Sequence, residues 1–349
     1  MFLGMAIDAA GCHPESRWYS PVDPLSPGHY SQLVQEAERG CFDFVTLDDS
    51  MALPDGPSAA DGLPDAVTVL AGVAPLTTTI GLVPTVTTTH CEPVHVSRAL
   101  ATLDHISQGR AGWRRRMVTA EAEAAHFGPE PPVGLNELRA EEAEFTEVVT
   151  KLWDSWEDGA EIREVAAGRF LDRSKLHHID HAGRHFRIKG PSNVPRPPQG
   201  HPVLAVDLDP RRYRVTAHDA DMVFVDVRDA LEARARVEAR TRVIGELEIL
   251  FDGDHGVSSW DCRTGEAASR RFRFAGSPIE LADLLGDMWG SGNVDGFHLR
   301  PAFLPATLSR FVAEVVPILR RRSLLRPPQG TSLRERLGLP EKAPNVFPV

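Results

Sequence analysis

The sequence predicts an α/β fold, a closed (β/α)8 barrel of the TIM type with one long insertion. Three observations lead to this prediction: eight short apolar runs, helical patterns between most of them, and a length that suits one large domain over 1–349. Most of the runs are continuous rather than alternating, as buried parallel strands are. They are MFLGMAID (1–8), FDFVTLDD (42–49), TIGLVPTVTT (79–88), RMVTA (116–120), HPVLAVDL (201–208), DMVFVDV (221–227), ELEILFD (246–252) and DGFHLRP (295–301). An open doubly wound sheet is the alternative architecture.

Helical patterns lie between these runs. One helix is predicted over about 27–39, because the pattern stops at Gly40, a residue type that commonly ends helices. A second is predicted over about 136–156, where apolar side chains recur at the spacing of one buried face. The segment SPIE (277–280) is a capping box with proline at the first helical position, so a third helix is predicted to begin there.

Residues 157–200 do not fit the strand–helix alternation. They are too long and too rich in proline and glycine for an ordinary connection. We interpret them as an insertion that carries a hairpin at HAGRHF (181–186) and covers one side of the barrel mouth. The stretch 252–273 is a second irregular excursion.

Composition narrows the class of protein. A formal net charge of −11 argues against a general nucleic-acid surface. The four cysteines (Cys12, Cys41, Cys91 and Cys262) lack CxxC spacing, which indicates reduced thiols. The longest uncharged stretch, 66–90, is interrupted by Thr, Pro and Gly, and the first residues lack the pattern of a secretory signal. We therefore expect a cytoplasmic protein with no membrane or nucleic-acid partner.

Six segments, in one order along the chain, resemble the bacterial luciferase-like flavin monooxygenases. They are AERGCFDFVTLDDS (37–50), LVPTVTTTHCEPVHVSRALATLDHISQGRAGW (82–113), EFTEVVTKLWDSWE (144–157), KLHHIDHAGRHFRIKGPSNVPRPPQGHPV (175–203), SPIELADLL with VDGFHLRP (277–285 and 294–301), and TSLRERLGLP (331–340). The branch most similar to this chain includes nitrilotriacetate, dibenzothiophene-sulfone and long-chain alkane monooxygenases and the pristinamycin synthase oxygenase subunit. The likeness extends from about Gly11 to Leu339.

The resemblance implies a two-component monooxygenase. Reduced FMN would be supplied by a separate flavin reductase, O2 would be activated on the flavin, and a small organic substrate would be oxygenated. The resemblance also implies a homodimer that forms through barrel helices, and a role in secondary metabolism is expected.

Two histidines are candidate catalytic residues. His13, just after the first apolar run, matches a histidine near the flavin in this branch, and histidine has a pKa suited to acid–base catalysis. A hydrogen-bonded loop histidine is the alternative interpretation. His90 stands where the family usually has an aromatic residue, and it is either a proton donor near the flavin or an exposed loop residue.

Candidate flavin-ring contacts end the second and third runs. By resemblance Asp49 lines the flavin ring, whereas Asp48 is expected to be structural. Thr85 and Thr87 match flavin-contact positions, although threonine is also simply a favourable strand residue.

The usual phosphate-binding elements are altered. Where the family reads Gly-Trp-Asn and later Val-Thr-Ser, this chain has Arg114 after Trp113, and Ala120 replaces the serine that contacts the FMN phosphate. After the fifth run the family has small residues, which let the backbone approach a phosphate. This chain has Asp207, Leu208, Asp209, Pro210 and Tyr213 instead.

Nearby arginines could offset the two added carboxylates, because guanidinium groups bind phosphate well. These arginines are Arg114, Arg115, Arg116, Arg211, Arg212 and Arg214. We take Arg114 and Arg211 as candidate cofactor ligands. The alternative interpretation of the arginines is a solvated basic patch.

Two further functions remain as alternatives. A flavin-free relative, acting as a partner subunit or as a catalyst of another reaction, would explain the altered phosphate elements. A metal-dependent barrel hydrolase would use Asp49, Asp207, Asp209 and Asp226, but clear ligand spacing is missing. The cluster HHIDH (177–181) is interpreted as a structural loop, because adjacent residues point in different directions, and we expect no metal site.

Overall fold

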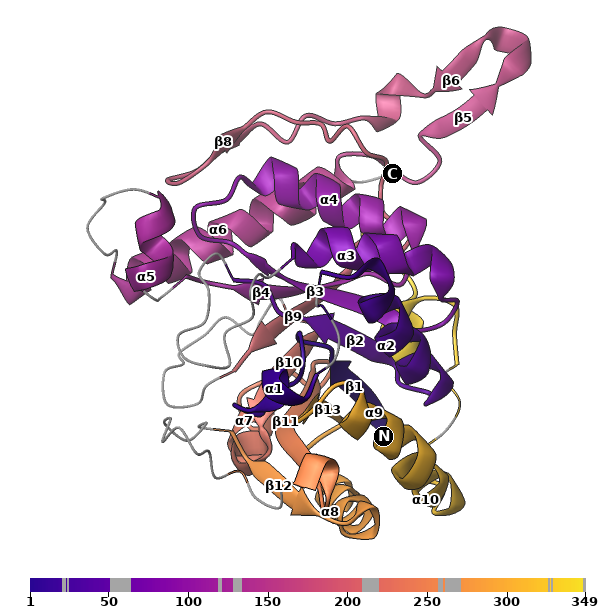
Figure 1. Cartoon of the computed structure of the whole chain (residues 1–349). Helices are drawn as coiled ribbons and strands as arrows, with labels where there is room; N and C mark the ends of the chain where they lie inside the picture. Colours follow the sequence, from indigo (N-terminus) through magenta and orange to yellow (C-terminus); the bar gives the residue numbers. More distant parts are fainter. Residues whose placement is uncertain are drawn as a thin grey trace.

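The protein is described by a computed structural model that covers residues 1–20, 23, 25–50, 64–118, 121–127, 134–208, 220–256, 260, 271–325, 327 and 329–347. Eight parallel strands form a closed barrel surrounded by helices (Figure 1), which confirms the predicted fold class. In order around the barrel they are β10 (Met222–Asp226), β9 (Val203–Asp207), β4 (Gly112–Arg116), β3 (Gly81–Thr87), β2 (Phe44–Leu47), β1 (Phe2–Ala6), β13 (Gly296–Pro301) and β11 (Arg242–Phe251). Pairing of β10 with β11 closes the ring.

Two strands differ from the prediction. Strand β4 begins at Gly112 and ends at Arg116, so it lies before the predicted segment 116–120 and carries all three arginines. The apolar criterion failed there because some inward-facing positions of this barrel are charged. Strand β11 is longer than predicted, and its last residues also pair with an additional parallel strand, β12 (Arg273–Gly276).

The helical predictions are confirmed. Helix α2 (Pro27–Arg39) ends at Gly40, α6 (Leu135–Asp154) has its apolar face buried, and α8 (Pro278–Gly290) begins with the Ser277–Glu280 capping box. The other helices are α1 (Ser16–Tyr19), α3 (Ala66–Val73), α4 (Pro93–Ile106), α5 (Glu121–Ala124), α7 (Ala230–Arg234), α9 (Ala306–Arg310), a π-helical turn (Phe311–Val315), α10 (Val316–Arg321) and α11 (Leu333–Arg336).

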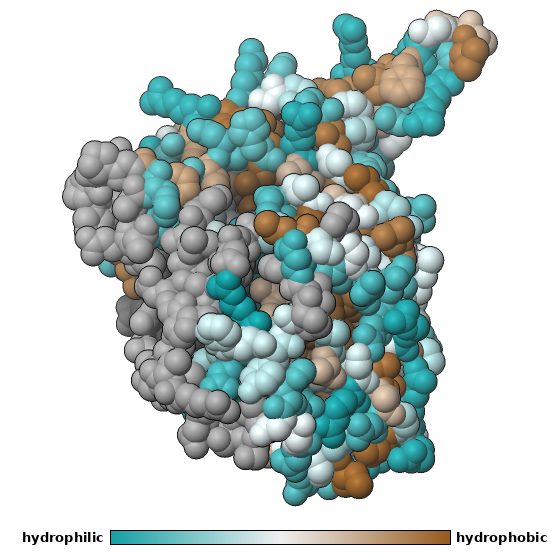
Figure 2. All heavy atoms as spheres, viewed as in Figure 1, coloured by the Kyte–Doolittle hydropathy of each residue, from teal (hydrophilic) through white to brown (hydrophobic). Residues whose placement is uncertain are grey.

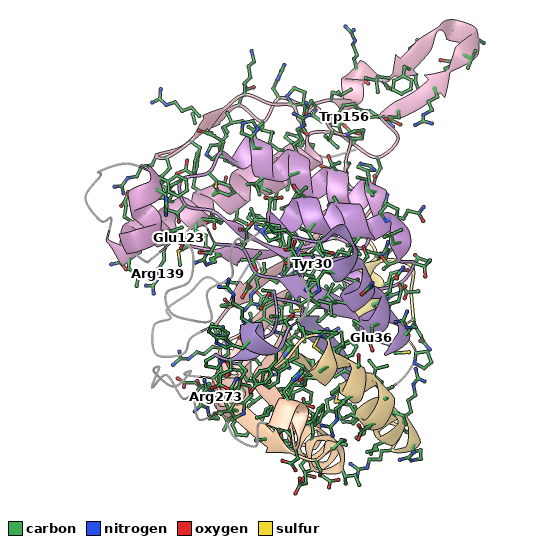
Figure 3. All side chains as sticks on the ribbon, in the orientation of Figure 1. Tyr30, Glu36, Glu123, Arg139, Trp156 and Arg273 are labelled. Carbon is green, nitrogen blue, oxygen red and sulfur yellow. The ribbon has the colours of Figure 1, made fainter. Side chains whose placement is uncertain are left out.

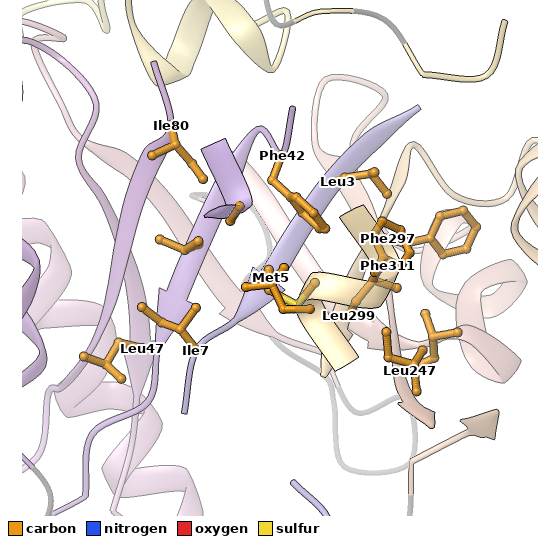
Figure 4. Close-up of a cluster of buried hydrophobic side chains, with 14 of the residues drawn as sticks. Leu3, Met5, Ile7, Phe42, Leu47, Ile80, Leu247, Phe297, Leu299 and Phe311 are labelled. Atoms are coloured by element: carbon orange, nitrogen blue, oxygen red, sulfur yellow. The ribbon is translucent and has the colours of Figure 1, made fainter. Parts of the chain in front are cut away.

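The main core lies between the barrel and its helices. Outward-facing strand residues such as Met5 and Leu299 pack with Phe311 from the helical layer, and all three are fully buried (Figure 4). A smaller cluster fills the amino-terminal end of the barrel, where Leu333 and Leu337 of the α11 region meet inward-facing strand residues. This end is closed by apolar packing, which leaves the carboxyl-terminal end for chemistry.

The insertion forms two hairpins. Strands β5 (Glu161–Glu164) and β6 (Arg169–Leu171) project from the body (Figure 1), and apolar residues lie at the tip (Figure 2), where Val165 is 92% exposed. Strands β7 (His181–Ala182) and β8 (Arg187–Ile188) form the predicted hairpin at 181–186.

The expectation that the insertion covers the barrel mouth is wrong. Its described contacts are with the outer helices: Trp156 Nε1 donates to Ser192 O at 2.8 Å near the base of the projecting hairpin (Figure 3), and His105 of α4 contacts Pro195 O at 3.2 Å. Glu144 of α6 accepts from His181 Nε2 and from the backbone N–H of Phe186, at 3.0 and 2.9 Å. Buried apolar and hydrogen-bonding partners on α4 and α6 therefore hold the insertion against the side of the barrel.

Replacing Glu144 should loosen the second hairpin. Glu144→Ala removes the acceptor of several hydrogen bonds and leaves buried donors unsatisfied, so we expect a loss of about 2 kcal/mol or more in the free energy of unfolding. Urea denaturation would measure the loss. The control is Glu147→Ala one turn away, which removes only an exposed pair with Lys151 and should change stability by less than about 0.5 kcal/mol. Equal effects of the two variants would contradict the role assigned to Glu144.

Candidate functional site at the barrel mouth

The inward-facing side chains change from apolar to charged towards the carboxyl ends of the strands. At the amino-terminal end the interior is lined by Phe44, Val83, Val203, Met222 and Ile244. Two residues further along the same strands, the inward positions become polar, and they become charged at the mouth. The polar and charged residues include Thr46, Asp48, Thr85, Arg114, Asp207, Glu246, His298 and Arg300. The mouth is thus the chemically functional end of the barrel.

Arg114 of β4 lies at the centre of this polar region. Its side chain is only 2% exposed. Its Nε and Nη2 donate to Asp207 Oδ1 at 2.9 and 2.5 Å, and Nη2 also donates to Glu246 Oε1 at 3.0 Å. The guanidinium carbon lies 4.5 Å from the centroid of the Phe224 ring. Burial opposes the charge of Arg114, but the carboxylates of Asp207 and Glu246 more than offset that cost and raise its pKa.

Glu246 connects Arg114 to a fully buried histidine. His298 Nδ1 lies 2.8 Å from Glu246 Oε1, and its Nε2 lies 2.8 Å from the hydroxyl of Thr46. Burial lowers the pKa of His298 to about 4, so the ring is neutral at pH 7. The neutral ring donates from Nδ1 to the carboxylate and accepts from the hydroxyl. Because Thr46 and His298 are both fully buried, these contacts order the interior rather than meet a substrate.

A second group of charges lies between β1, β2 and β13. Arg300 contacts Asp8 Oδ2 at 3.0 Å and Asp48 Oδ2 at 3.3 Å, and the backbone N–H of Asp48 donates to Asp8 Oδ1 at 2.9 Å. Burial and the neighbouring Asp48 raise the pKa of Asp8 to about 6. Burial also disfavours ionised Asp48, but Arg114 and Arg300 outweigh it and hold the pKa of Asp48 below its usual range. The mouth therefore has one carboxyl that is always ionised and one that titrates near neutrality.

Asp48 and Asp207 are the carboxylates of this group that solvent reaches most readily. Their side chains are 41% and 50% exposed, although both extend into the barrel towards Arg114. Desolvation, together with the charge of Glu246, raises the pKa of Asp207 despite its contact with Arg114. Both carboxylates therefore face a space that a small molecule could enter.

The structure places His13 at the mouth, directly after β1. The residue is buried, its ring centroid lies 4.9 Å from that of Phe303 and 5.5 Å from that of Trp260, and Nδ1 accepts from the backbone N–H of Glu15 at 3.1 Å. These contacts fix the ring orientation. They match the hydrogen-bonded loop histidine of the alternative interpretation and leave a catalytic role as a proposal.

His90 and Asp49 lie at the rim. His90 is exposed and its ring stacks on Phe127, with centroids 4.7 Å apart. Asp49 Oδ2 accepts from the backbone N–H of Ala66 at the start of α3, at 3.2 Å, and burial raises the pKa of Asp49. Asp49 and Thr87 also line a cavity of about 700 Å³ between α3 and α4.

Thr85 is committed to the charged interior. Its hydroxyl donates to Asp48 Oδ1 at 2.9 Å, and its side chain is buried. Asp48, expected to be structural, thus lies deeper in the mouth than Asp49, which was the expected flavin contact.

The three consecutive arginines have three different environments. Arg114 points into the barrel, whereas Arg115 points outward and donates to the Thr146 hydroxyl of α6 at 3.0 Å. Arg116 donates to both carboxylate oxygens of Glu123, at 2.9 and 2.8 Å, and Figure 3 shows Glu123 beside α5. The solvated basic patch is therefore wrong for Arg114 and Arg115, which are buried.

Several residues named from the sequence lie outside the described ranges. They are Ala120, Asp209, Pro210, Arg211, Arg212, Tyr213, Arg214 and Cys262. The predicted phosphate elements are thus described only as far as Val118 and Leu208.

Sequence reasoning missed Asp8, Glu246, His298 and Arg300. A signal for three of them was present, since Glu246 and Glu248, and His298 and Arg300, are charged or polar residues two positions apart within apolar strands. This spacing puts both members of a pair on one face of a strand. In a closed barrel that face is the interior.

The histidines of HHIDH have separate partners. His177 lies 2.6 Å from Glu157, His178 contacts Gly190 O at 2.7 Å, and His181 binds Glu144. Within the described ranges no group of three or more His, Cys, Asp or Glu residues could hold a metal ion. No helix in this part of the chain is both long and apolar enough to cross a membrane.

The family is shown by sequence comparison. A model of the luciferase-like monooxygenase family matches residues 11–246. The chain belongs to this family. It is similar to nitrilotriacetate monooxygenase component A of Aminobacter aminovorans, with 31% identity over 97% of this chain and 96% of the relative. It is also similar to N-acetyl-S-(2-succino)cysteine monooxygenase of Bacillus subtilis (strain 168), with 29% identity over 99% of this chain and 98% of the relative. These relatives support an oxidoreductase of the monooxygenase class.

Solved structures support the same fold. An EDTA monooxygenase from Chelativorans sp. BNC1 superimposes with a TM-score of 0.84 at 23% identity, covering 98% of this chain and 99% of that one. A riboflavin lyase solved with modified FMN and riboflavin gives a TM-score of 0.82 at 23% identity, covering 97% of this chain and 96% of that one. At these identities the likeness concerns the barrel alone.

Removing Arg114 should destabilise the fold strongly. Arg114→Met leaves Asp207 and Glu246 without their buried partner, so we expect a loss of about 3–5 kcal/mol in the free energy of unfolding, measured by urea denaturation. The matched control is Arg163→Met, which removes an exposed guanidinium paired with Glu161 and should cost less than about 0.5 kcal/mol. A loss below 1 kcal/mol for Arg114→Met would show that the interior does not depend on this charge.

Asp8 should make stability depend on pH. Because its pKa is raised, the folded chain binds this proton more tightly than the unfolded chain does. Its contribution is fully present below pH 4 and is lost as the pH rises through about 6. The free energy of unfolding of the unmodified chain should therefore fall more between pH 4 and pH 7 than that of Asp8→Asn, by at most about 3 kcal/mol. Parallel curves for the two proteins would contradict the shifted pKa.

Proposed function

We propose that the chain is the oxygenase component of a two-component monooxygenase that receives reduced flavin from a separate reductase and uses O2 to oxygenate a small organic substrate. The observation that carries the proposal is similarity over nearly the full length to named monooxygenases. One of these is itself named as a component, and others are named as subunits of pristinamycin IIA synthase. A barrel with a polar mouth is the architecture that such a reaction needs.

We assign the predicted residues to roles on the basis of their placement. Asp49, Thr85 and Thr87 follow or end β2 and β3 and would border the flavin ring. His13 would act as the acid or base next to the reacting centre, and His90 would contribute from the rim. Position at the carboxyl ends of β1, β2 and β3 supports these assignments.

The described residues do not fit the phosphate of FMN. Every arginine that they place at the mouth already contacts a carboxylate: Arg114, Arg116, Arg271, Arg273 and Arg300. Asp48 and Asp207 are ion-paired but add negative charge that repels a phosphate. Arg211 remains a proposed ligand outside the described ranges. We therefore propose that FMN is held weakly, chiefly through its ring.

A flavin-free catalyst or partner subunit is the second candidate. The observation that favours it is the ion-paired interior itself, since a buried guanidinium with carboxylates on both sides is a poor floor for a flavin ring. Homodimerisation, a cytoplasmic location and a role in secondary metabolism also remain proposals that rest on family resemblance.

Anaerobic titration with reduced FMN and with reduced riboflavin would test the proposal. If the phosphate contributes no net binding energy, the two flavins should bind within about threefold of each other. If Arg211 and its neighbours form a rebuilt site, two charge-assisted hydrogen bonds would favour FMN by roughly two to four powers of ten. Failure of both reduced flavins to bind would overturn the two-component proposal and favour the flavin-free candidate.

A further inference from the structure

Three side chains at the centre of the mouth form an alternating set of hydrogen-bonding groups, which we call the mouth triad: Asp48, Arg114 and Asp207. Arg114 contacts Asp207 through Nη2 at 2.5 Å and approaches Asp48 through Nη1 at 3.6 Å. The two carboxylates therefore lie on opposite sides of one guanidinium group. The triad presents an acceptor, a donor and a second acceptor.

The central donor is incompletely used. Arg114 Nη1 is buried but has no hydrogen-bond acceptor in the described part of the chain, because Asp48 Oδ1 at 3.6 Å is too distant. Native structures leave few buried donors unsatisfied, and each such donor is a candidate contact for a water molecule or a ligand. This observation is independent of the carboxylates and indicates a missing acceptor atom at the triad.

The flanking acceptors have spare capacity. Asp207 uses Oδ1 for both of its contacts with Arg114, and Oδ2 accepts no hydrogen bond from the residues that the structure describes. Half of its side chain is exposed. Asp48 is exposed to a similar extent, while the surrounding Arg114, Glu246 and Arg300 are nearly covered. A ligand that enters the mouth would therefore meet carboxylate oxygens on both sides of the guanidinium.

We propose that the mouth triad is a substrate subsite for a polar group with two N–H donors on either side of one acceptor, as in a urea or a diaminopyrimidine. The donors would bind Asp48 and Asp207, and the acceptor would satisfy Arg114 Nη1. This inference rests on the proposed function, since it names the substrate class of that site.

The same pattern rejects two other kinds of ligand. The pyrimidine edge of a flavin has a carbonyl, an N–H and a carbonyl, which is the reverse order and would place carbonyl oxygens against carboxylates. A polycarboxylate such as nitrilotriacetate, named in one relative, would meet the same repulsion. The triad thus selects a neutral or cationic group rich in N–H donors.

Two probes of the same ring size test the order of donors and acceptors. They are 2,4-diaminopyrimidine, with donor, acceptor and donor along one edge, and uracil, with acceptor, donor and acceptor. Binding of each to the full chain without flavin would be measured by calorimetry at about pH 8.5, where the diaminopyrimidine ring is uncharged. Because a matched bidentate edge discriminates by about 1–3 kcal/mol, we expect 2,4-diaminopyrimidine to bind roughly tenfold or more tightly than uracil.

Variants separate the triad from general electrostatics. Asp207→Asn should weaken 2,4-diaminopyrimidine binding by about tenfold, and Asp48→Asn serves as the second test if loss of Asp207 impairs folding. The control is Asp252→Asn, which removes an exposed carboxylate just beyond the end of β11 and should leave binding unchanged. Circular dichroism would establish that each variant is folded.

The outcomes are decisive for the subsite and separate from those for flavin. Equal or tighter binding of uracil, unchanged binding in both triad variants, or no binding of either probe at about 10 mM would overturn the inference. A chain that binds reduced flavin but not the probe would retain the proposed function and lose the subsite. A chain that binds the probe through Asp207 but binds no reduced flavin would retain the subsite and lose the two-component proposal.

Discussion

The interior of this barrel depends on the neutralisation of one buried guanidinium. Arg114 extends from β4 into the space enclosed by the strands, where an unpaired charge would be very costly. Asp207 from β9 and Glu246 from β11 supply the compensating charges, so three separate strands are coupled through a single side chain. Glu246 in turn orients His298, and Asp48 connects the same group to Arg300. The polar contents of the upper barrel therefore form one connected network rather than a set of independent pairs.

This network changes what the mouth can accept. A family barrel that binds FMN needs donors for the phosphate and a floor compatible with the flavin ring. Here the described arginines are already paired, and the most accessible groups between β2 and β9 are carboxylates. Any anion that recruited Arg114 would have to displace Asp207 or Glu246 and leave that carboxylate buried without a partner. The stability of the interior thus opposes the use of this arginine as a phosphate ligand.

The sequence predicted the features that depend on local patterns. The helix over 27–39 and the capping box at 277–280 are determined by residues within a few positions of each other, and both appear as predicted. The placement of the insertion was wrong, because the side of the barrel that it covers depends on partners such as Glu144. Most of the site was missed for the same reason. Arg114 and Glu246 are 132 positions apart, and only closure of the barrel brings them together.

The run Arg114–Arg116 shows how far period-two reasoning extends. Along a strand, successive side chains face opposite sides, so one run of like residues must divide between two environments. Arg115 faces Thr146 of α6, whereas Arg114 faces the interior and Arg116 reaches Glu123 at the rim. Three arginines that look like one basic patch in the sequence are therefore three separate structural elements. Their charges cannot be summed to predict an anion site. Within the described chain, each guanidinium first stabilises the protein, and only the unsatisfied Nη1 of Arg114 remains available for recognition.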